Sequence, residues 1–302
     1  SIRSVHLEIS TRCNAACPLC PRNLYGYPYN NGYVEHDMTL QEAQIIFRPE
    51  FLAQLELILI NGNFGDFTAN LESLDIIEYF RINNPNIFIK ASTNGSARNH
   101  EFWKKLASYD VQVDFALDGL EDTHHLYRQD TDFDRIIDNA LAFIKAGGKA
   151  IWRFIPFDHN RHEEEHCKKL SQELGFVRFE NIHEGRDRGP VFTRDGELSH
   201  WLGPKQNWSL DSKRMVEDHI TQECQAVNNE NVSFFPRMYS SKGNIVFLPV
   251  AHVLNELVEG SGAGNKLSLD DVRFVVVGFV VDVFPESWID NFGITKNIQS
   301  VV

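Results

Sequence analysis

Three cysteines lie close together near the start of the chain: Cys13, Cys17 and Cys20. Their spacing is C-x3-C-x2-C, and they follow a short apolar run that predicts a strand. Three thiolates placed in this way can bind three irons of a [4Fe-4S] cluster, which leaves the fourth iron open to a small molecule. A ferredoxin-type site uses four cysteines, but the next cysteine in this chain is Cys167.

A structural zinc site, or three unrelated thiols, is the alternative explanation of this triplet. Zinc takes four ligands, usually from two C-x2-C-like pairs. The sequence has no second pair that matches the first, because its two other cysteines, Cys167 and Cys224, lie far apart. The spacing therefore favours an iron–sulfur cluster. Cys167 falls in a predicted helix, where we expect a half-buried structural thiol.

Composition limits the classes of protein that the chain can belong to. Its 302 residues are 42% hydrophobic, enough for one large domain or for one plus a smaller one, and the formal net charge is −13. An acidic surface argues against non-specific binding of nucleic acid and against docking to anionic lipid. The odd number of cysteines, the polar N-terminus and the short length of the most apolar run, 274–284, predict a cytoplasmic protein without a membrane span.

Strand-like and helix-like patterns alternate over the first 180 residues. Gly147 and Gly175 mark the ends of two predicted helices, and Thr39 with Glu42 forms a capping box before another. Such alternation predicts an α/β fold with a parallel sheet, either doubly wound or an incomplete barrel, and in both cases ligands bind at the C-terminal ends of the strands. The predicted strands are Val5–Ile9, Leu55–Ile60, Ile87–Ser92, Val111–Leu117, Ala150–Ile155 and Val177–Glu180.

Two apolar stripes with helical spacing lie between these strands. One consists of Leu71, Leu74, Ile77 and Phe80, and the other of Ile136, Ala140, Phe143 and Ile144. A further helix is predicted from about Glu163 to Leu174.

The cysteine triplet in its strand-to-helix loop resembles the signature of radical S-adenosylmethionine (SAM) enzymes, and further motifs follow in the order of that family. Asn61-Gly62-Asn63-Phe64-Gly65-Asp66 is similar to the glycine-rich "GGE" motif, with Asp66 in place of Glu. Ser92-Thr93-Asn94-Gly95 stands at the end of the third predicted strand. Asp118-Gly119, followed by His125 and Arg128, is similar to the D-G…H-x-x-x-R pattern of the SPASM/twitch branch.

This resemblance implies a partial (β/α)6 TIM-like barrel that holds one [4Fe-4S] cluster and SAM. The cluster would be bound by Cys13, Cys17 and Cys20. The SAM ammonium would be held by Gly62, Asn63, Phe64, Gly65 and Asp66, and the SAM sugar or carboxylate by Ser92 and Asn94. Asp118 would face the SAM ribose, and Arg128 would pair with the SAM carboxylate. An electron from an external flavodoxin- or ferredoxin-like reductant would cleave SAM to a 5′-deoxyadenosyl radical. That radical would abstract hydrogen from a peptide or small-molecule substrate, in oxidoreductase- or lyase-type chemistry.

The pattern changes after about residue 190, and we place a boundary between domains 1–205 and 206–302. Cys224 and a hairpin over residues 232–248 resemble the twitch or SPASM extension of the same superfamily. In that extension a proline is followed by cysteines that hold an auxiliary cluster, but this chain has Pro249-Val250-Ala251-His252. We therefore expect a degenerate twitch-like domain without an auxiliary cluster.

A competing signal is His162-Glu163-Glu164-Glu165-His166, which satisfies the H-E-x-x-H pattern of zinc hydrolases. It opens a helix that should lie outside the sheet, away from the strand ends, so a solvated His/Glu face is the favoured interpretation. A zinc-dependent hydrolase remains one alternative. Another is a non-catalytic descendant that keeps the cluster as a structural or sensing element.

Overall fold

The computed structural model describes residues 3–20, 22–28, 35–62, 65–182 and 189–203. The predicted C-terminal domain, 206–302, lies outside the described residues with Cys224, Val250, Ala251 and His252, as do Asn63 and Phe64. No helix in the described ranges combines the length and the apolar character that crossing a bilayer requires.

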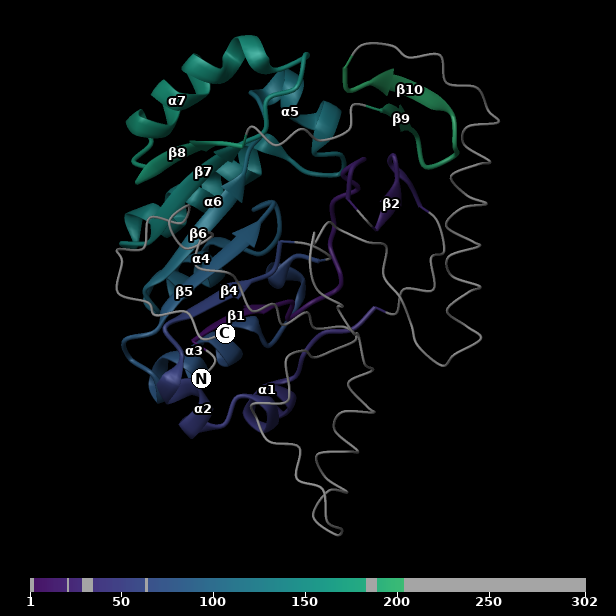
Figure 1. The fold of residues 1–302 in the computed structure, drawn as a ribbon. Helices are drawn as coiled ribbons and strands as arrows, with labels where there is room; N and C mark the ends of the chain where they lie inside the picture. The colour runs from purple at the N-terminus through teal and green to yellow at the C-terminus, as the bar shows by residue number, and fades with distance from the viewer. Residues whose placement is uncertain (1–2, 21, 29–34, 63–64, 183–188, 204–302) are drawn as a thin grey trace, which may run out of the picture.

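Six parallel strands form the central sheet, in the order β1-β4-β5-β6-β7-β8 (Figure 1). Each strand of this sheet pairs with the sheet strand that follows it in the chain, so the strand order never reverses as it would in a doubly wound sheet. The predicted α/β fold with a partial barrel is therefore confirmed. The strands are β1 (Ser4–Leu7), β4 (Leu57–Ile60), β5 (Phe88–Thr93), β6 (Val111–Ala116), β7 (Lys149–Phe154) and β8 (Arg178–Asn181).

Helices follow the strands and cover one face of the sheet (Figure 1). Their apolar side chains and the outward side chains of the strands form the main core. Trp103, Phe115 and Trp152 are fully buried there, and Cys167 is also 0% exposed, so the expectation of a half-buried thiol was wrong. The helical segments are α1 (Leu40–Ile46), α2 (Pro49–Gln54), η1 (Phe67–Ala69), α3 (Ser73–Asn83), α4 (His100–Ala107), α5 (Glu121–Tyr127), α6 (Phe133–Lys145), η2 (Arg161–Glu163) and α7 (Glu164–Glu173).

Local sequence signals account for most helix ends. The Thr39–Glu42 capping box opens α1 as predicted, and Gly147 and Gly175 adopt positive φ angles of 92° and 87° after α6 and α7. The stripe that begins at Leu71 is only partly correct, because α3 begins at Ser73 and Leu71 is 80% exposed. Asn70 Oδ1 accepts a hydrogen bond from the backbone N of Glu72, at 2.8 Å, and this turn delays the start of the helix.

Two short hairpins lie beside each other at the edge of the barrel (Figure 1). They are formed by β2 (Asn23–Leu24) with β3 (Tyr27–Pro28), and by β9 (Pro190–Phe192) with β10 (Leu198–Trp201). The backbone N of Phe192 donates to the carbonyl O of Tyr25 at 2.8 Å, which joins the two hairpins. The β2–β3 hairpin follows the cysteine triplet directly, so this contact fixes the far end of the cysteine loop.

The inner face of the sheet is polar, unlike a complete TIM barrel, whose interior is filled by branched aliphatic side chains. Lys90 on β5, Asp114 on β6, Arg153 on β7 and Glu180 on β8 alternate in charge across four neighbouring strands. Lys90 Nζ lies 2.9 Å from Asp114 Oδ2, and the two side chains are 3% and 0% exposed. Burial raises the pKa of Asp114, and the charges of Lys90 and Arg153 oppose that rise.

Substitution of Asp114 by Ala should destabilise the fold by about 3–5 kcal/mol, because it removes the carboxylate that lies 2.9 Å from the buried Lys90 ammonium. The double variant Lys90→Met/Asp114→Leu removes both charges and should recover most of that loss. Urea unfolding of the three proteins measures both effects. Equal stability of Asp114→Ala and the parent would show that the pair is not a buried ion pair in solution.

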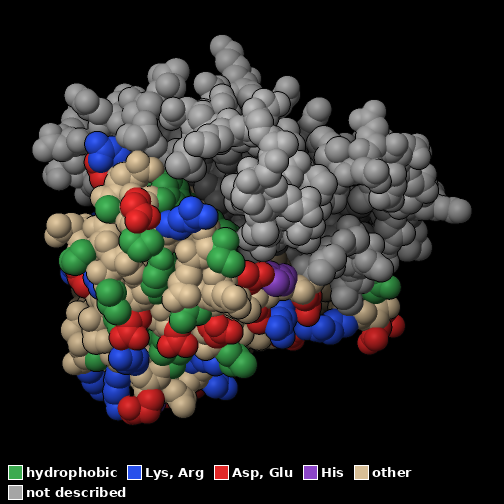
Figure 2. Space-filling view, turned by 90° about the horizontal axis from the view of Figure 1, so that it is seen from below, with side chains coloured by type: hydrophobic (Ala, Val, Ile, Leu, Met, Phe, Trp, Pro, Cys, Tyr) green, Lys and Arg blue, Asp and Glu red, His purple; other side chains and the backbone are tan. Residues whose placement is uncertain are grey.

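Acidic and basic side chains are interspersed on the described part of the face in Figure 2. We see no single-sign patch of charge on that described part of the face.

Candidate functional site

The cysteine loop leaves the C-terminal end of β1 and carries the three thiols toward the ends of the other strands. Cys13, Cys17 and Cys20 are all free, and they belong to a second apolar cluster that also contains Tyr127 and Phe157. The backbone N of Ala15 donates to Cys13 Sγ at 3.4 Å, and the N of Cys20 donates to the carbonyl of Cys17 at 3.0 Å. The loop is therefore folded around its sulfur atoms.

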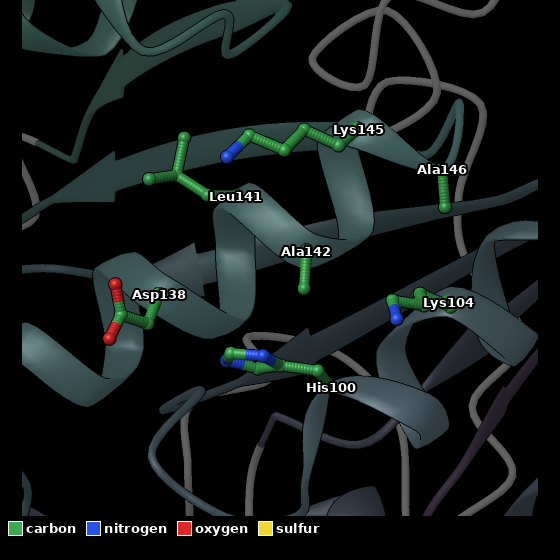
Figure 3. Close-up of a pocket in the computed structure, with 7 residues that line it drawn as sticks. All are labelled: His100, Lys104, Asp138, Leu141, Ala142, Lys145 and Ala146. Carbon is green, nitrogen blue, oxygen red and sulfur yellow. The ribbon is translucent and has the colours of Figure 1, made fainter.

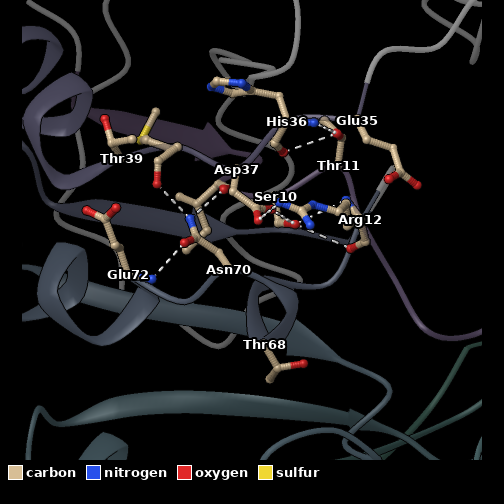
Figure 4. Close-up of polar contacts among 12 residues, drawn as sticks. Ser10, Thr11, Arg12, Glu35, His36, Asp37, Thr39, Thr68, Asn70 and Glu72 are labelled. Atoms are coloured by element: carbon tan, nitrogen blue, oxygen red, sulfur yellow. Dashed lines mark hydrogen bonds and ion pairs between the residues drawn. The ribbon is translucent and has the colours of Figure 1, made fainter.

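A polar network anchors the residues that precede the first cysteine (Figure 4). Ser10 Oγ donates to Asp37 Oδ1 at 2.7 Å, and Arg12 forms an ion pair with the other oxygen of Asp37 at 2.5 Å. The backbone N of Thr11 donates to the carbonyl of His36 at 2.9 Å. These contacts fix the path of the chain on both sides of Thr11, immediately before Cys13.

Asn70 ties the same strand end to two other segments (Figure 4). Its Nδ2 donates to the carbonyls of Ile9 and Met38, each at 2.8 Å. Asn70 is 1% exposed, so these hydrogen bonds satisfy carbonyl groups that have no access to water. The segment just after β1 is thus held by a side chain from 61 residues further along the chain.

Burial raises the pKa values of the outer two cysteine thiols. For Cys20 the pKa rises to about 11, through burial first and then the neighbouring Cys17. The pKa of Cys13 rises further, through burial, the Asp66 carboxylate and Cys17. The thiols at Cys13 and Cys20 are thus protonated at neutral pH when no metal is bound, and metal binding must release those protons.

Two arginines place positive charge beside the triplet. Arg22 NH1 donates to the carbonyl of Cys13 at 3.3 Å, and its charge lowers the pKa values of Cys13 and Cys20 against the effect of burial. Arg128 NH1 lies 3.6 Å from Cys17 Sγ. Both cations would compensate the negative charge of bound thiolates. The sequence motifs identified Arg128 but not Arg22. The position of Arg22, two residues after the triplet, was the one feature of the sequence that could have indicated a role beside the thiols.

The carboxylate of Asp66 joins the loop after β4 to the end of β5. It accepts hydrogen bonds from Thr68 N at 3.0 Å, Thr93 Oγ1 at 2.9 Å and Asn94 N at 2.7 Å. Asp66 is 3% exposed, and burial raises its pKa against these hydrogen bonds. In the structure its oxygens accept from protein donors and hold the end of β5. The contact of Asp66 with a ligand ammonium stays a prediction.

Asn94 is the residue that links this carboxylate to the cysteine loop. Its Nδ2 lies within hydrogen-bond distance of three acceptors: Asp66 Oδ2 at 2.8 Å, Asn14 Oδ1 at 3.0 Å and Cys13 Sγ at 3.4 Å. Asn94 was predicted as a site residue, and the structure places its amide beside the first cysteine. Asn14 was missed, because nothing in the triplet spacing marks the residues between the cysteines.

Asp118 and Arg128 form a buried ion pair after β6. Arg128 Nε lies 2.5 Å from Asp118 Oδ2, and the backbone N of Ile155 donates to Asp118 Oδ1 at 2.6 Å. Burial alone would lower the pKa of Arg128, but Asp118 and Cys17 raise it above its usual range. Arg128 therefore stays charged at any working pH, and its NH1 is directed to Cys17.

Gly62, Gly65 and Ser92, the other predicted residues that the structure describes, lie at the same edge. Ser92 lies on β5, and a Cβ at Gly62 would stand 3.5 Å from its side chain. Gly65 packs so tightly on the cysteine loop that a Cβ there would come within 2.0 Å of the carbonyl O of Ser10. Gly65 therefore permits the close approach of the β4 and β1 loops. The roles predicted for these residues in ligand binding stay predictions.

His124 stabilises the backbone of Asp118 in its neutral form. Its Nδ1 accepts from the N of Asp118 at 3.2 Å, which assigns the proton to Nε2, 3.1 Å from Thr131 Oγ1. Burial, together with the charges of Arg128 and His125, lowers the pKa of His124 to about 3. Because this folded-state pKa lies below the unfolded value, the stabilisation is complete above about pH 6.5 and declines as the pH falls toward 3.

The free energy of unfolding should therefore fall by up to about 1.4 kcal/mol per pH unit below pH 6.5 through His124 alone. In His124→Gln the free energy of unfolding should depend less steeply on pH between pH 6.5 and 5, by nearly the equivalent of one bound proton. His100→Gln, at an exposed position of α4, is the matched control and should leave the slope unchanged. Urea unfolding at each pH measures the free energy of unfolding. An unaltered pH dependence of that free energy in His124→Gln would contradict this account.

The donor set fits the [4Fe-4S] cluster that the sequence predicts. Cluster thiolates accept hydrogen bonds, and N–H groups of Ala15, Asn94 and Arg128 lie against the sulfurs of Cys13 and Cys17. The fourth described cysteine, Cys167, is buried in the separate main core on α7, so it is not part of this site. The described residues thus supply three thiolates, two cations and a shell of N–H donors.

The zinc alternative finds less support in the geometry. His162 lies in η2 and His166 in α7, so the two imidazoles do not share one α-helix. In the part of the chain that the structure describes, no three His, Cys, Asp or Glu side chains form a group suited to a single metal ion. His162 and His166 thus have no third ligand among those residues.

A groove of about 330 Å³ lies elsewhere, between α4 and α6 on the outer helical layer (Figure 3). Its lining is formed by His100, Lys104, Asp138, Leu141, Ala142, Lys145 and Ala146. None of these residues belongs to the loops that carry the thiols, so the groove is separate from the candidate site.

Comparison with known families agrees with this geometry. Residues 7–170, more than half of the chain, match the family model described as the Radical SAM superfamily. The match spans the cysteine loop, Asp66, Asn94, Asp118 and Arg128. No curated protein sequence matches the chain significantly.

Solved structures show a related fold at low sequence identity. Streptococcus suis SuiB bound to precursor peptide SuiA has a TM-score of 0.50 and 17% identity, over 74% of this chain and 46% of SuiB. For native anSMEcpe with bound AdoMet and Cp18Cys peptide the TM-score is 0.48 and the identity 18%, over 76% of this chain and 62% of that chain. The chain spans about half the length of the SuiB chains that it matches.

Proposed function

Since the chain belongs to the radical SAM superfamily, we propose that it binds one [4Fe-4S] cluster through Cys13, Cys17 and Cys20 and reductively cleaves SAM. When bound, the cluster and SAM together supply a carbon-centred radical that takes a hydrogen atom from the substrate. We further propose that the electron comes from an external flavodoxin- or ferredoxin-like protein and that no auxiliary cluster takes part.

One observation carries this proposal: side chains from three other strand ends meet at the cysteine loop. Asn94 contacts Cys13 from the end of β5, and Asp66 holds Asn94 from the loop after β4. Arg128 contacts Cys17 from the connection after β6. In parallel α/β barrels the C-terminal strand ends form the ligand site, so the thiols stand where a cofactor is expected.

We assign each group a separate task. The three thiolates bind iron, and Arg22 and Arg128 compensate their charge. The NH1 group of Arg128 also suits the SAM carboxylate, because a planar guanidinium binds carboxylates well. Asp118 fixes Arg128 through Nε and, in the family's pattern, faces the ribose.

The substrate we propose is polar. The inner face of the sheet presents Lys90, Asp114, Arg153 and Glu180. Asp114 Oδ1 and Arg153 Nε are buried without a hydrogen-bond partner in the described structure. Buried polar groups of this kind are usually satisfied by a ligand or by water. The related SuiB is bound to a precursor peptide, so a peptide is one candidate beside a small polar molecule.

Anaerobic reconstitution with iron and sulfide, followed by metal and sulfide analysis, tests the proposal against its alternatives. We expect about four irons and four sulfides per chain. Zinc without iron would instead support the hydrolase that uses His162 and His166. A complete cluster that never cleaves SAM under strong reductant would support the non-catalytic descendant.

A further inference from the structure

A buried acid from the connection between β7 and α7 reaches the loop that carries Asp118. Glu163, at the end of η2, is 7% exposed, and its Oε2 accepts a hydrogen bond from the backbone N of Leu120 at 3.0 Å. The same oxygen accepts a hydrogen bond from the Thr123 hydroxyl, forty residues earlier in the chain. Glu163 thereby joins the β7–α7 connection to the first turn of α5.

The loop that Glu163 contacts has little freedom. Gly119 has a φ of +115°, and a Cβ there would stand 2.1 Å from Thr123 Oγ1 and 3.0 Å from Glu163 Oε2. Asp118 immediately precedes this glycine, and Arg128 is the C-cap of the helix that begins two residues after it. The carboxylate of Glu163 therefore binds the segment that connects Asp118 to Arg128 in the chain.

A second side chain from the same connection contacts Asp118 itself. Asn160 is fully buried, and its Nδ2 donates to the carbonyls of Asp118 and Ile155, each at 3.1 Å. His162, by contrast, points outward with 71% of its side chain exposed. The acid of the H-E-x-x-H pattern thus faces inward to the loop, away from the position that a zinc site on the helix surface would require.

We propose that Glu163 is a positioning residue for SAM binding: it fixes the first turn of α5 so that Asp118 and Arg128 face Cys17. Hydrogen bonds from a buried N–H and a hydroxyl to a charged acceptor are stronger than neutral ones. Without this carboxylate, Leu120 N keeps only the Thr123 oxygen, at 3.2 Å. The proposal rests on the proposed function, because it concerns the same SAM site.

The test compares three variants of the full chain: Glu163→Ala, Glu163→Gln and the control Glu165→Gln. The control changes a neighbouring acid whose side chain is 85% exposed. Amide hydrogen exchange, measured without cluster or SAM, should quicken about tenfold at Leu120 in Glu163→Ala, since a hydrogen bond to a charged group is lost. Glu163→Gln keeps an acceptor in place and should stay within about threefold of the parent. The control should match the parent.

SAM binding to the reconstituted protein gives the second readout, by equilibrium dialysis with labelled SAM. Glu163→Ala should raise the Kd about tenfold, and Glu163→Gln should restore most of the affinity. In the cleavage assay Glu163→Ala should raise the KM for SAM, while its kcat stays within about twofold of that of the parent.

Three results would overturn the proposal. The first is unchanged exchange and unchanged Kd in Glu163→Ala. The second is a loss confined to kcat, which would make Glu163 a catalytic group. The third is a parent protein that neither binds nor cleaves SAM. That third result also defeats the proposed function, whereas the first two leave the parent active and defeat only the role of Glu163.

Discussion

Alanine at any one of Cys13, Cys17 and Cys20 is expected to abolish 5′-deoxyadenosine formation. A cluster held by three thiolates has no spare ligand, and Cys167 cannot replace one because it is buried in the separate main core. Reconstituted variants should therefore fall from about four irons per chain toward background. Iron analysis and the characteristic cluster absorption, both measured anaerobically, give the result.

Cys167→Ala is the matched control for these substitutions. It removes a thiol that is 0% exposed on α7, so it should reduce stability modestly while leaving the iron content unchanged. A Cys17→Ala protein with the parent's iron and sulfide content would contradict the ligand assignment. Loss of iron in Cys167→Ala without unfolding would do the same.

Replacement of Arg128 by Met should have the second largest effect, on both stability and SAM affinity. It leaves the Asp118 carboxylate, which is 0% exposed, without a counter-charge and should cost about 3–5 kcal/mol. The double variant Asp118→Asn/Arg128→Met removes both charges and should recover most of that stability. SAM affinity should stay low in both proteins, because neither keeps the guanidinium.

Urea unfolding and SAM dialysis on the same three proteins separate these two roles. Recovery of stability together with recovery of SAM affinity in the double variant would show that Arg128 acts only as the partner of Asp118. If the double variant recovers neither stability nor SAM affinity, another contact of these two residues determines the conformation of the loop, such as the hydrogen bond from Ile155 N to Asp118.

Features encoded by residues close in sequence were predictable. The strands fall within two residues of their predicted ends, because alternating strand and helix patterns, the Thr39 cap and the glycines after α6 and α7 are local signals. The cysteine triplet is equally local. Leu71 was misplaced because a long-range role of Asn70, in binding the carbonyls of Ile9 and Met38, sets the turn before α3.

The contacts that build the site were not predictable in the same way. Asn94 meets Cys13 across 81 residues, and Glu163 meets Leu120 across 43. Such pairs depend on which strands are neighbours, which no single-sequence pattern specifies. The H-E-x-x-H match misleads in the opposite way, because a sequence motif specifies residue types but not the direction of their side chains. In the structure the 3₁₀ turn η2 directs Glu163 inward.

The central claim is that this chain cleaves SAM at a cluster held by its three N-terminal cysteines. Its most direct test is the amount of 5′-deoxyadenosine formed from SAM by the anaerobically reconstituted chain with dithionite, quantified by mass spectrometry. We expect more than one equivalent per chain over time, and none without reductant or in Cys17→Ala. A fully loaded parent that forms no 5′-deoxyadenosine, or a Cys17→Ala variant that forms it at the parent's rate, would contradict the claim.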